Sequence, residues 1–414
     1  MKKYVDSSWD FRNENTKQLT HCFHSYPAMM IPQIAARLIE KHGRSGGILF
    51  DPYCGTGTSI VEANVRNMNT VATDINPLAR LIAKVKSTLI PIQVLDFYIK
   101  DFNEYCLNYR FGRFEVHYEI PIFPNIDFWF KEATKRELAF LKHYIIQIED
   151  SNVHDFFMIA FSETIREVSL TKNSEFKLVR MREENIKSFS PDTIAIFANK
   201  LFRNRNGLLD FSNLVKDQRK NRILDFNTVF EIPTENIEDD SIDLIVTSPP
   251  YGDSKTTVAY GQFSRLSNQW LGFENSNQID NLAMGGKRAV EFHKFGIEQL
   301  DEQIEKIAFK DIKRALEVVS FYDDYKSSIS NISKKLTKGG KVIFVVGNRR
   351  VKDQELPTDL ATCEFFESND FSHIGTVIRN IPNKKMPRAN SPTNIIGQLK
   401  STMNFEYIVT LVKN

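Results

Sequence analysis

The sequence predicts an α/β protein with a mostly parallel sheet, interrupted by an inserted, mainly helical domain. Short apolar runs alternate with helical patterns in residues 1–90, and the same alternation resumes in residues 222–414. The intervening stretch, 91–221, is mostly helical in pattern. Because a strand–helix–strand–helix order favours parallel pairing, we expect one sheet built from two separated halves of the chain.

In the first half, each element is marked by its periodicity and by the residues that end it. Apolar residues recur at helical spacing from Tyr26 to Lys41, and Gly43 ends the run. A buried strand at 48–50 leads into a glycine-containing loop and a helix from about Thr58. A second strand, 70–73, precedes a helix that starts near Pro77, because proline is favoured in a first turn.

The second half and the insertion are predicted in the same way. Helical patterns cover Phe140–Ile148 and Phe156–Val168 in the insertion, whose later part is rich in Lys and Arg. The predicted strands of the second half are Ile223–Asp225, Ile242–Val246, Lys341–Val346 and Glu406–Val412.

The composition indicates an ordinary globular protein with 42% hydrophobic and 26% charged residues. No stretch is apolar and long enough to cross a bilayer, and the first residues lack the core of a secretory signal. Four scattered cysteines without a CxxC pair favour reduced thiols over disulfides or a zinc site, so we expect a cytoplasmic protein. A net charge of +2 neither requires nor excludes nucleic acid.

The loop after the first strand has features of a nucleotide-cofactor site. Gly55 and Gly57 allow a tight turn and close approach to a ligand, and a helix begins at about Thr58. Asp74 ends the next strand, where a carboxylate can accept both ribose hydroxyls of a nucleoside. The third glycine of the dinucleotide fingerprint is missing, which disfavours a nicotinamide cofactor. A simple packing turn is the alternative.

The segment Thr247-Ser-Pro-Pro-Tyr251 follows the predicted strand 242–246. Two consecutive prolines cannot extend a sheet, so this segment leaves the strand as a rigid loop with outward carbonyls. Such a loop can accept hydrogen bonds from an amino group, and Tyr251 offers a face on which a base can stack. A plain strand-ending turn is the alternative, but ligands of open α/β sheets bind at this edge.

Together these motifs resemble those of the amino-methylating DNA methyltransferases. Asp51–Thr58 with Asp74 resembles motifs I and II, and Ser248–Tyr251 has the motif IV form typical of cytosine-N4 enzymes. The other segments that carry the resemblance are Thr20–His24 with Tyr26–Ala28 (motif X), Asp225 (motif III), and the later Gly339-Gly340, Gly347–Arg349, Lys384–Pro387 and Asn390–Thr393.

The resemblance implies a Rossmann-like methyltransferase fold, S-adenosylmethionine as cofactor and double-stranded DNA as substrate. It points to a restriction–modification enzyme with a cognate restriction endonuclease in the same cell, and it implies no stable complex between the two. No metal is expected. The implied catalytic residues are Ser248, Pro249, Pro250 and Tyr251. The implied cofactor-binding residues are His24, Tyr26, Pro27, Phe50, Asp51, Pro52, Gly55, Gly57, Thr58, Asp74, Ile75, Asp225 and Phe226.

The expected reaction is methyl transfer to the N4 amino group of a flipped cytosine. Hydrogen bonds to the Ser248 hydroxyl and the Pro249 carbonyl would localise the nitrogen lone pair, while the cofactor supplies an activated methyl group. A covalent carbon-5 mechanism would need a cysteine after a proline in the catalytic loop, and no cysteine follows a proline. Adenine-N6 methylation, RNA amino-group methylation and a non-catalytic DNA-binding subunit remain alternatives.

The recognition region is predicted from charge. The helical insertion 91–221 is the first choice, because its later part concentrates Arg and Lys; the segment 252–311 is the second. The expected DNA-binding residues are Arg203, Arg205, Lys255 and Arg265.

Overall fold

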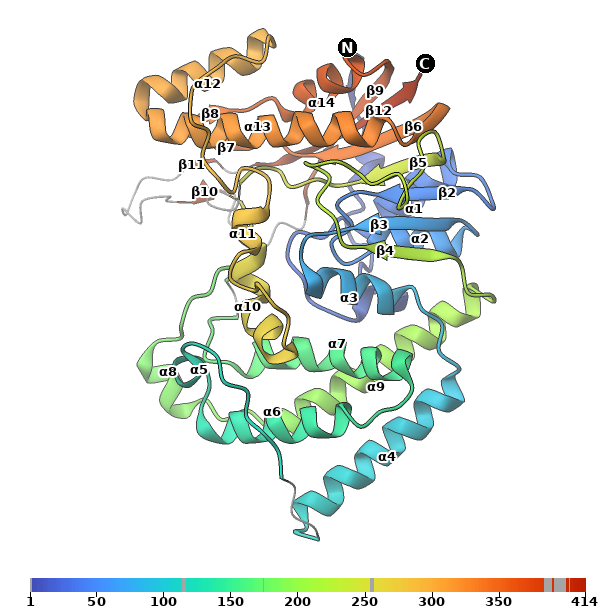
Figure 1. Ribbon diagram of the computed structural model, residues 1–414, viewed down its shortest axis with the longest axis vertical. Coiled ribbons are helices and arrows are strands. Elements are labelled where there is room, and N and C mark those ends of the chain that lie inside the picture. Colours follow the sequence, from blue (N-terminus) through green and yellow to red (C-terminus); the bar gives the residue numbers. More distant parts are fainter. Residues whose placement is uncertain are drawn as a thin grey trace.

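The computed structural model describes residues 2–113, 117–173, 175–253, 257–382 and 403–414, together with the backbone of 389–390 and 400–401. Among these residues an eight-stranded sheet has the order β1-β9-β12-β6-β5-β2-β3-β4 (Figure 1). β12 is antiparallel to its neighbours β6 and β9, and the other neighbouring strands are parallel. The predicted mostly parallel α/β fold is therefore confirmed. The strands are β1 Lys3–Val5, β2 Ile48–Asp51, β3 Asn69–Thr73, β4 Asn221–Leu224, β5 Ile242–Thr247, β6 Leu336–Val346, β9 Phe371–Asn380 and β12 Phe405–Lys413.

The sheet contains every strand that the sequence predicts, and two that it does not. β2, β3, β5, β6 and β12 cover the predicted apolar runs, and β4 ends one residue before Asp225. β1 and β9 form the far edge of the sheet and were not predicted. β1 is short and exposed, and β9 mixes buried with exposed polar residues, so neither has a continuous apolar run.

Helices cover both faces of the sheet, and alternate strand residues point to opposite faces. Ile245 and Phe344 belong to the cluster beneath α13 and α14, whereas Leu244 and Val345 belong to the cluster beneath α1. The helices of this part are α1 Pro32–His42, α2 Thr58–Val65, α3 Pro77–Lys86, α12 Glu298–Lys310, α13 Ile312–Ser333 and α14 Thr358–Glu367. The remaining small elements are η1 Ser7–Trp9, η2 Leu19–Cys22, and the pairs β7 Arg350–Val351 with β8 Gln354–Glu355 and β10 Ala389–Asn390 with β11 Lys400–Ser401.

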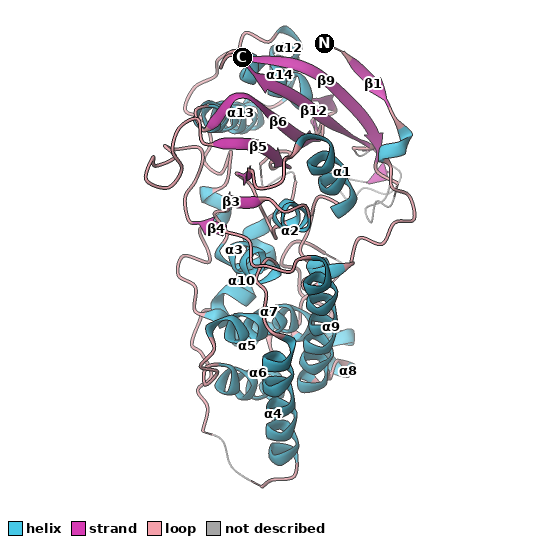
Figure 2. Cartoon of the chain, turned by 90° about the vertical axis from the view of Figure 1, so that its right-hand side faces the viewer, coloured by secondary structure: helices cyan, strands magenta, loops and turns pink. Residues whose placement is uncertain are grey.

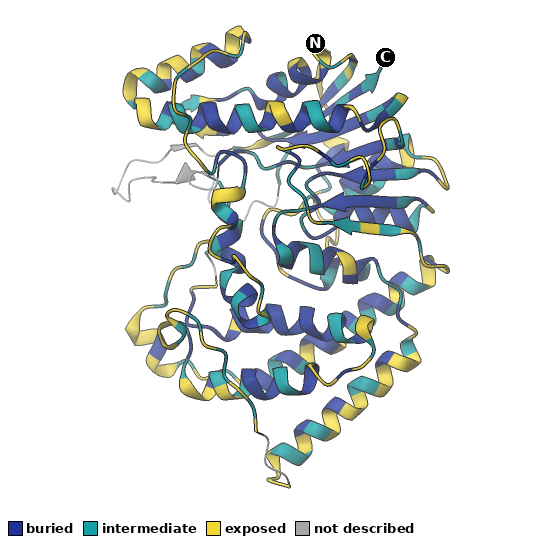
Figure 3. Ribbon diagram, viewed as in Figure 1, coloured by how far each residue is buried: buried dark blue, intermediate teal, exposed yellow. Residues whose placement is uncertain are grey.

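The insertion forms a helical block below the sheet, and its outermost helix, α4, projects from the block (Figure 2). α7 lies at its centre and is buried along most of its length, whereas α4 keeps an exposed outer face (Figure 3). Asp150 starts α7, since its side chain accepts the free N–H groups of Asn152 and Val153. The block contains α4 Ile92–Arg110, α5 Ile126–Trp129, α6 Glu132–Ile145, α7 Ser151–Val168, α8 Glu183–Ser188 and α9 Thr193–Leu214. No helix among the described residues is long and apolar enough to span a membrane.

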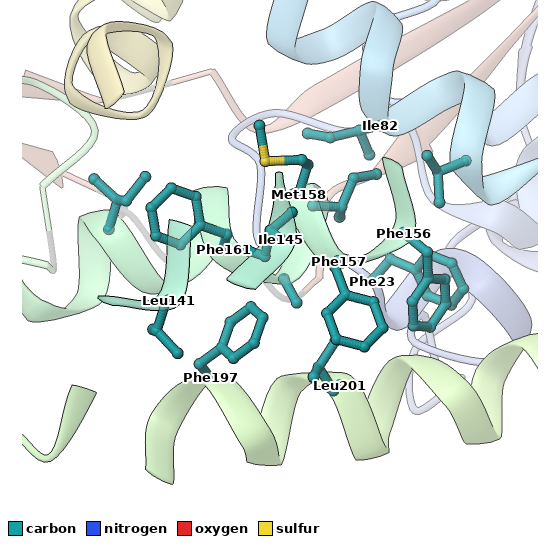
Figure 4. Close-up of a cluster of buried hydrophobic side chains, with 14 of the residues drawn as sticks. Phe23, Ile82, Leu141, Ile145, Phe156, Phe157, Met158, Phe161, Phe197 and Leu201 are labelled. Atoms are coloured by element: carbon teal, nitrogen blue, oxygen red, sulfur yellow. The ribbon is translucent and has the colours of Figure 1, made fainter. Parts of the chain in front are cut away.

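The helical block shares a hydrophobic core with the sheet's flanking helices. Ile82 of α3 and Phe23 belong to the same buried cluster as Phe156, Met158 and other side chains of α7 (Figure 4). The rings of Phe23 and Phe156 meet edge to face at 5.5 Å. The block is therefore packed firmly against the sheet-containing part and holds a defined position relative to the strand ends.

We expect Phe157→Ala to lower the free energy of unfolding by about 3–5 kcal/mol, because the side chain is fully buried and leaves a cavity. Its ring packs against Phe102, Tyr144 and Phe197, which come from three other helices. Chemical denaturation followed by circular dichroism measures the loss. Phe202→Ala is the control, since Phe202 is 65% exposed and should cost less than about 0.5 kcal/mol. Equal losses would contradict this core assignment.

A second connection joins the helical block to the sheet. α10 Tyr260–Leu271 and α11 Ile279–Leu282 lie between the helical block and the part of the chain that contains the sheet and α13 (Figure 1). Ser267 of α10 donates to the carbonyl of Ser162 on α7 at 2.7 Å, and Asp280 of α11 accepts from the main-chain N–H groups of Gly261 and Gln262. These contacts place α10 and α11 beside the carboxyl ends of the strands.

Candidate active site

A cleft lies at the carboxyl ends of β2, β3, β4 and β5, with an empty volume of about 1120 Å³ that includes space open to solvent. In an open parallel sheet this edge is the usual ligand site. Nine of the residues predicted to bind the cofactor line the cleft: Tyr26, Pro27, Asp51, Pro52, Gly55, Thr58, Asp74, Ile75 and Phe226.

The loop after β2 is shaped by two glycines with positive φ, 48° at Gly55 and 78° at Gly57. A side chain on Gly57 would come within 2.9 Å of the Ala83 side chain, so Gly57 serves close packing against α3. A Cβ on Gly55 would meet nothing within 4 Å, so this residue presents bare backbone to the cleft.

Asp74 is fixed at the end of β3 by the backbone around it. Its two oxygens accept from Gly55 N at 3.0 Å and from Asn76 N at 2.8 Å. Burial raises the pKa of the Asp74 carboxyl, and these two hydrogen bonds oppose the rise. The side chain is thus oriented and lines the cleft, where its remaining lone pairs can accept from a ligand.

Asp51 joins the glycine loop to the loop after β5. Thr247 Oγ1 donates to Asp51 Oδ1 at 2.5 Å, and the Ser59 hydroxyl donates to the other oxygen. Burial raises the pKa of Asp51 to about 6, against the effect of the hydrogen bonds from Ser59, Thr247 and Tyr53. These hydrogen bonds hold the loop after β2 and the loop after β5 in fixed positions relative to each other.

The loop after β5 brings Ser248 and Pro250 to the cleft lining, whereas Pro249 and Tyr251 do not line it. Ser248 Oγ lies 3.0 Å from the Val345 carbonyl, to which it donates, and 3.3 Å from the Tyr251 hydroxyl. The Tyr251 hydroxyl donates to Glu406 at 3.0 Å. Both hydroxyl groups are therefore oriented by contacts with the strands behind the loop.

The far end of this loop is held by a buried ion-pair cluster. Asp253 is 1% exposed and accepts from Arg314 at 2.7 Å and Arg349 at 2.5 Å. These two guanidinium groups keep the pKa of Asp253 well below its usual range, although burial acts in the opposite direction. A Cβ on Gly252 would lie 2.3 Å from Arg349, so glycine is needed for this approach.

Four predicted cofactor-binding residues do not line the cleft. Phe50 points from β2 into the core beneath α13 and α14, and Gly57 packs on α3. Asp225 is largely exposed and pairs with Arg80 at 2.7 Å. His24 is buried beside Glu163, and burial lowers its pKa to about 4. Neither ring nitrogen of His24 has a hydrogen-bond partner among the described residues.

Several lining residues were not predicted from the sequence. They come from the stretch before α1, from the loops after β2, β3, β4 and β5, and from α10, α11 and their flanks: Ala28, Met29, Met30, Tyr53, Cys54, Thr56, Asn76, Asn227, Thr228, Gly252, Val258, Tyr260, Ile279, Asp280, Leu282, Ala283 and Met284. The rings of Tyr26 and Tyr260 stack at 5.8 Å with an interplanar angle of 15°. The sequence indicates the segment 252–311 only as a candidate for DNA recognition, yet part of this segment lines the cleft.

The predicted DNA-binding residues are placed as follows. Arg203 pairs with the buried Glu163 at 2.6 Å, and Arg205 pairs with Asp96 through two hydrogen bonds of 2.8 Å. Arg265 is partly buried, and its Nε has no partner in the part of the chain that the structure describes. Lys255 lies outside the described residues, as do Lys384–Pro387 and Ser391–Thr393. Contact of these residues with DNA stays a prediction.

Within the described ranges, no group of three or more His, Cys, Asp or Glu side chains is arranged to hold a metal ion.

Comparison with known proteins shows the family. The chain is 40% identical to the Type II methyltransferase M.MvaI of Kocuria varians over 425 residues, covering 98% of this chain and 93% of the relative. It is 21% identical to the Type II methyltransferase M.BsoBI of Geobacillus stearothermophilus, covering 87% and 80% of the two chains. The chain therefore belongs to the Type II methyltransferases. It is a DNA methyltransferase, and its α/β fold is the Rossmann-like fold expected from the motifs.

Two further comparisons add no functional information. The TrmN structure from Thermus thermophilus overlaps 93% of this chain and 49% of that chain at 9% identity, with a TM-score of 0.31, which is too low to support an argument. No protein-family model matches the chain.

Proposed function

We propose that the enzyme transfers a methyl group from S-adenosylmethionine to the N4 amino group of a cytosine flipped out of double-stranded DNA. The observation that carries the proposal is Ser248 at the wall of the cleft, with its hydroxyl proton directed to the Val345 carbonyl. Its oxygen lone pairs are then free to accept a hydrogen from an amino group.

The residues around the cleft fit the cofactor. Asp74 can accept the ribose hydroxyls, and Gly55 leaves room for the nucleoside beside it. The carboxylates of Asp74 and Asp280 both line the cleft and give it negative charge, which suits a cationic sulfonium. S-adenosylmethionine supplies, when bound, a methyl group that is already activated for transfer.

The protein contributes orientation. Ser248 accepts from one hydrogen of the amino group, and the main-chain carbonyls of the loop, which reaches the cleft at Pro250, can accept from the other, so that the nitrogen lone pair points toward the cofactor's methyl group. The rigid Pro249-Pro250 backbone keeps these acceptors in place, and the Asp51 network fixes the loop relative to the cofactor loop. The motif IV tetrapeptide begins with a serine, Ser248, and this form favours cytosine N4 over adenine N6 as the methylated atom.

Incubation of the purified protein with methyl-labelled S-adenosylmethionine and either duplex DNA or RNA tests the proposal. We expect label in DNA and none in RNA of the same sequence. Label only in RNA, or cofactor binding without transfer to any DNA sequence, would contradict it. We further propose that the enzyme acts in the cytoplasm and that the same cell contains a cognate restriction endonuclease.

For DNA recognition we propose the edge of the helical block that adjoins α10. There Leu178 N donates to Gln262 on α10 at 3.3 Å. Lys177 precedes Leu178 in the chain, and Arg182 and Lys187 follow at the start of α8 and within it; all three are exposed and have no ion-pair partner among the residues that the structure describes. Arg203 and Arg205 are held by carboxylates instead, so these three are the better placed phosphate ligands in the block.

Replacing Lys177, Arg182 and Lys187 together by glutamine should weaken DNA binding and reduce its salt dependence, by about one unit of slope per lost phosphate contact. The control triple variant replaces three other exposed lysines and changes the net charge equally. These are Lys41 at the end of α1, Lys334 directly after α13, and Lys338 in the first part of β6. Fluorescence anisotropy over a range of salt concentrations compares the two. If both triple variants show the same DNA affinity and salt dependence, this edge of the helical block does not recognise DNA.

A further inference from the structure

We infer that Glu406, at the start of β12, is a positioning residue that fixes the Tyr251 hydroxyl and thereby the direction of the Ser248 hydroxyl. The inference rests on the proposed function, since it concerns how Ser248 is prepared to accept an amino hydrogen. Glu406 is 158 residues from Ser248 along the chain, and none of the segments that carry the family resemblance includes it.

Glu406 itself is held firmly. It lies opposite Arg379 in the register of β12 and β9, and the two side chains form an ion pair. Arg379 is 3% exposed, and its other nitrogens donate to the carbonyls of Trp9 at 2.8 Å and Asp10 at 3.1 Å. A guanidinium fixed on three sides leaves its partner carboxylate little freedom.

The carboxylate determines which way the next hydrogen bonds run. A carboxylate paired with arginine only accepts, so the Tyr251 hydroxyl must donate its proton to Glu406 across the 3.0 Å contact. The Tyr251 oxygen can then only accept, and the Ser248 hydroxyl 3.3 Å away is the group in position to donate to it. The Ser248 proton is shared between the Val345 carbonyl at 3.0 Å and the Tyr251 oxygen, and these two acceptors together fix the hydroxyl so that its lone pairs face the substrate.

The ring of Tyr251 is held as well as its hydroxyl. It packs against the backbone of Gly347, where a Cβ would come within 2.7 Å of Tyr251 Cδ2. Burial, and next the Glu406 carboxylate, raises the pKa of Tyr251 well above its usual value, so the hydroxyl stays protonated and able to donate. The chain from Arg379 through Glu406 and Tyr251 therefore connects two strands of the sheet to the catalytic serine.

A double-mutant cycle tests this role, using Tyr251→Phe, Glu406→Gln and the combined variant. Tyr251→Phe keeps the ring and leaves the Glu406–Arg379 pair intact, so it removes only the hydrogen bonds of the Tyr251 hydroxyl. We expect each single variant to slow single-turnover methyl transfer about tenfold, with cofactor affinity unchanged, and the combined variant to be no slower than the slower single variant. Asp240→Asn is the matched control, because it breaks an ion pair with Lys413 at the other end of β12.

Wild-type rates in Tyr251→Phe, or losses that multiply in the combined variant, would overturn the inference. A measurement independent of activity is the NMR signal of tyrosines labelled at Cζ, in which Tyr251 is assigned by its loss in Tyr251→Phe. Its signal should shift in Glu406→Gln and not in Asp240→Asn, and an unshifted signal would also overturn the inference. If the wild-type protein methylates no DNA, the proposed function fails while the NMR result still decides the contact. If Glu406→Gln does not fold, the rate of Tyr251→Phe alone decides.

Discussion

Ser248→Ala is expected to slow methyl transfer on the order of 100-fold while cofactor affinity changes less than about twofold. The variant loses the acceptor that Ser248 presents to the amino group, and that contact matters most as the new bond forms. The cofactor loop is unaffected, because it is held by Asp51 and Asp74 through other hydrogen bonds. Single-turnover kinetics with labelled cofactor measure the rate, and calorimetry measures the affinity.

Ser212→Ala serves as the control for this experiment. Ser212 on α9 also donates to a main-chain carbonyl, that of Leu209 at 2.8 Å, but it does not line the cleft. Its variant should retain the wild-type rate. Parallel loss of rate and affinity in Ser248→Ala would instead indicate that the serine maintains the fold of the loop.

The second large effect is expected at Asp74, where replacement by alanine should weaken cofactor binding by about 1.5–3 kcal/mol. The change removes a charge-assisted hydrogen-bond acceptor from the end of β3, and it also leaves the Gly55 and Asn76 N–H groups without their partner. Asp155→Asn is the control, since it removes a partly buried carboxylate that pairs with Lys84 on α3, away from the cleft lining. Unchanged affinity in Asp74→Ala would contradict the assignment.

The same residue gives the cofactor affinity a pH dependence. Burial raises the pKa of Asp74 above the usual aspartate value, so its carboxylate becomes protonated at a higher pH than an exposed aspartate. The charged acceptor is present above this raised pKa and is lost as the pH falls through it. Cofactor affinity, measured by calorimetry over a pH series, should therefore decline in the wild type as the pH falls through this raised pKa, and the part of the decline that is due to Asp74 should be absent in Asp74→Ala.

The part of the fold that the sequence predicts is the part with local signals. β2 and β5 are mostly apolar, and β6 ends in the buried apolar run 342–346, so these strands are recognised without knowing their neighbours. β9 pairs with β12 and the three-residue β1, and its alternating exposure becomes evident only once that pairing is known. The glycine and proline loops were located because their conformations need those residues.

The part of the site that the sequence does not predict depends on long-range packing. Tyr260 reaches the cleft because α10 packs on α7 and stacks its tyrosine on Tyr26, a contact between segments more than 200 residues apart. The basic pattern of α9 likewise does not show that Arg203 and Arg205 face the carboxylates of Glu163 and Asp96. Charge along a sequence identifies candidates for DNA contact, and only the structure shows which of them are already paired.

The proposed target of this DNA methyltransferase is the N4 amino group of cytosine. Mass spectrometry of nucleosides from the DNA of cells that express the wild-type chain tests it most directly, with cells expressing Ser248→Ala as the comparison. We expect N4-methylcytosine in the first sample and strongly reduced N4-methylcytosine in the second. N6-methyladenine or 5-methylcytosine as the new modified base, with no N4-methylcytosine, would contradict it.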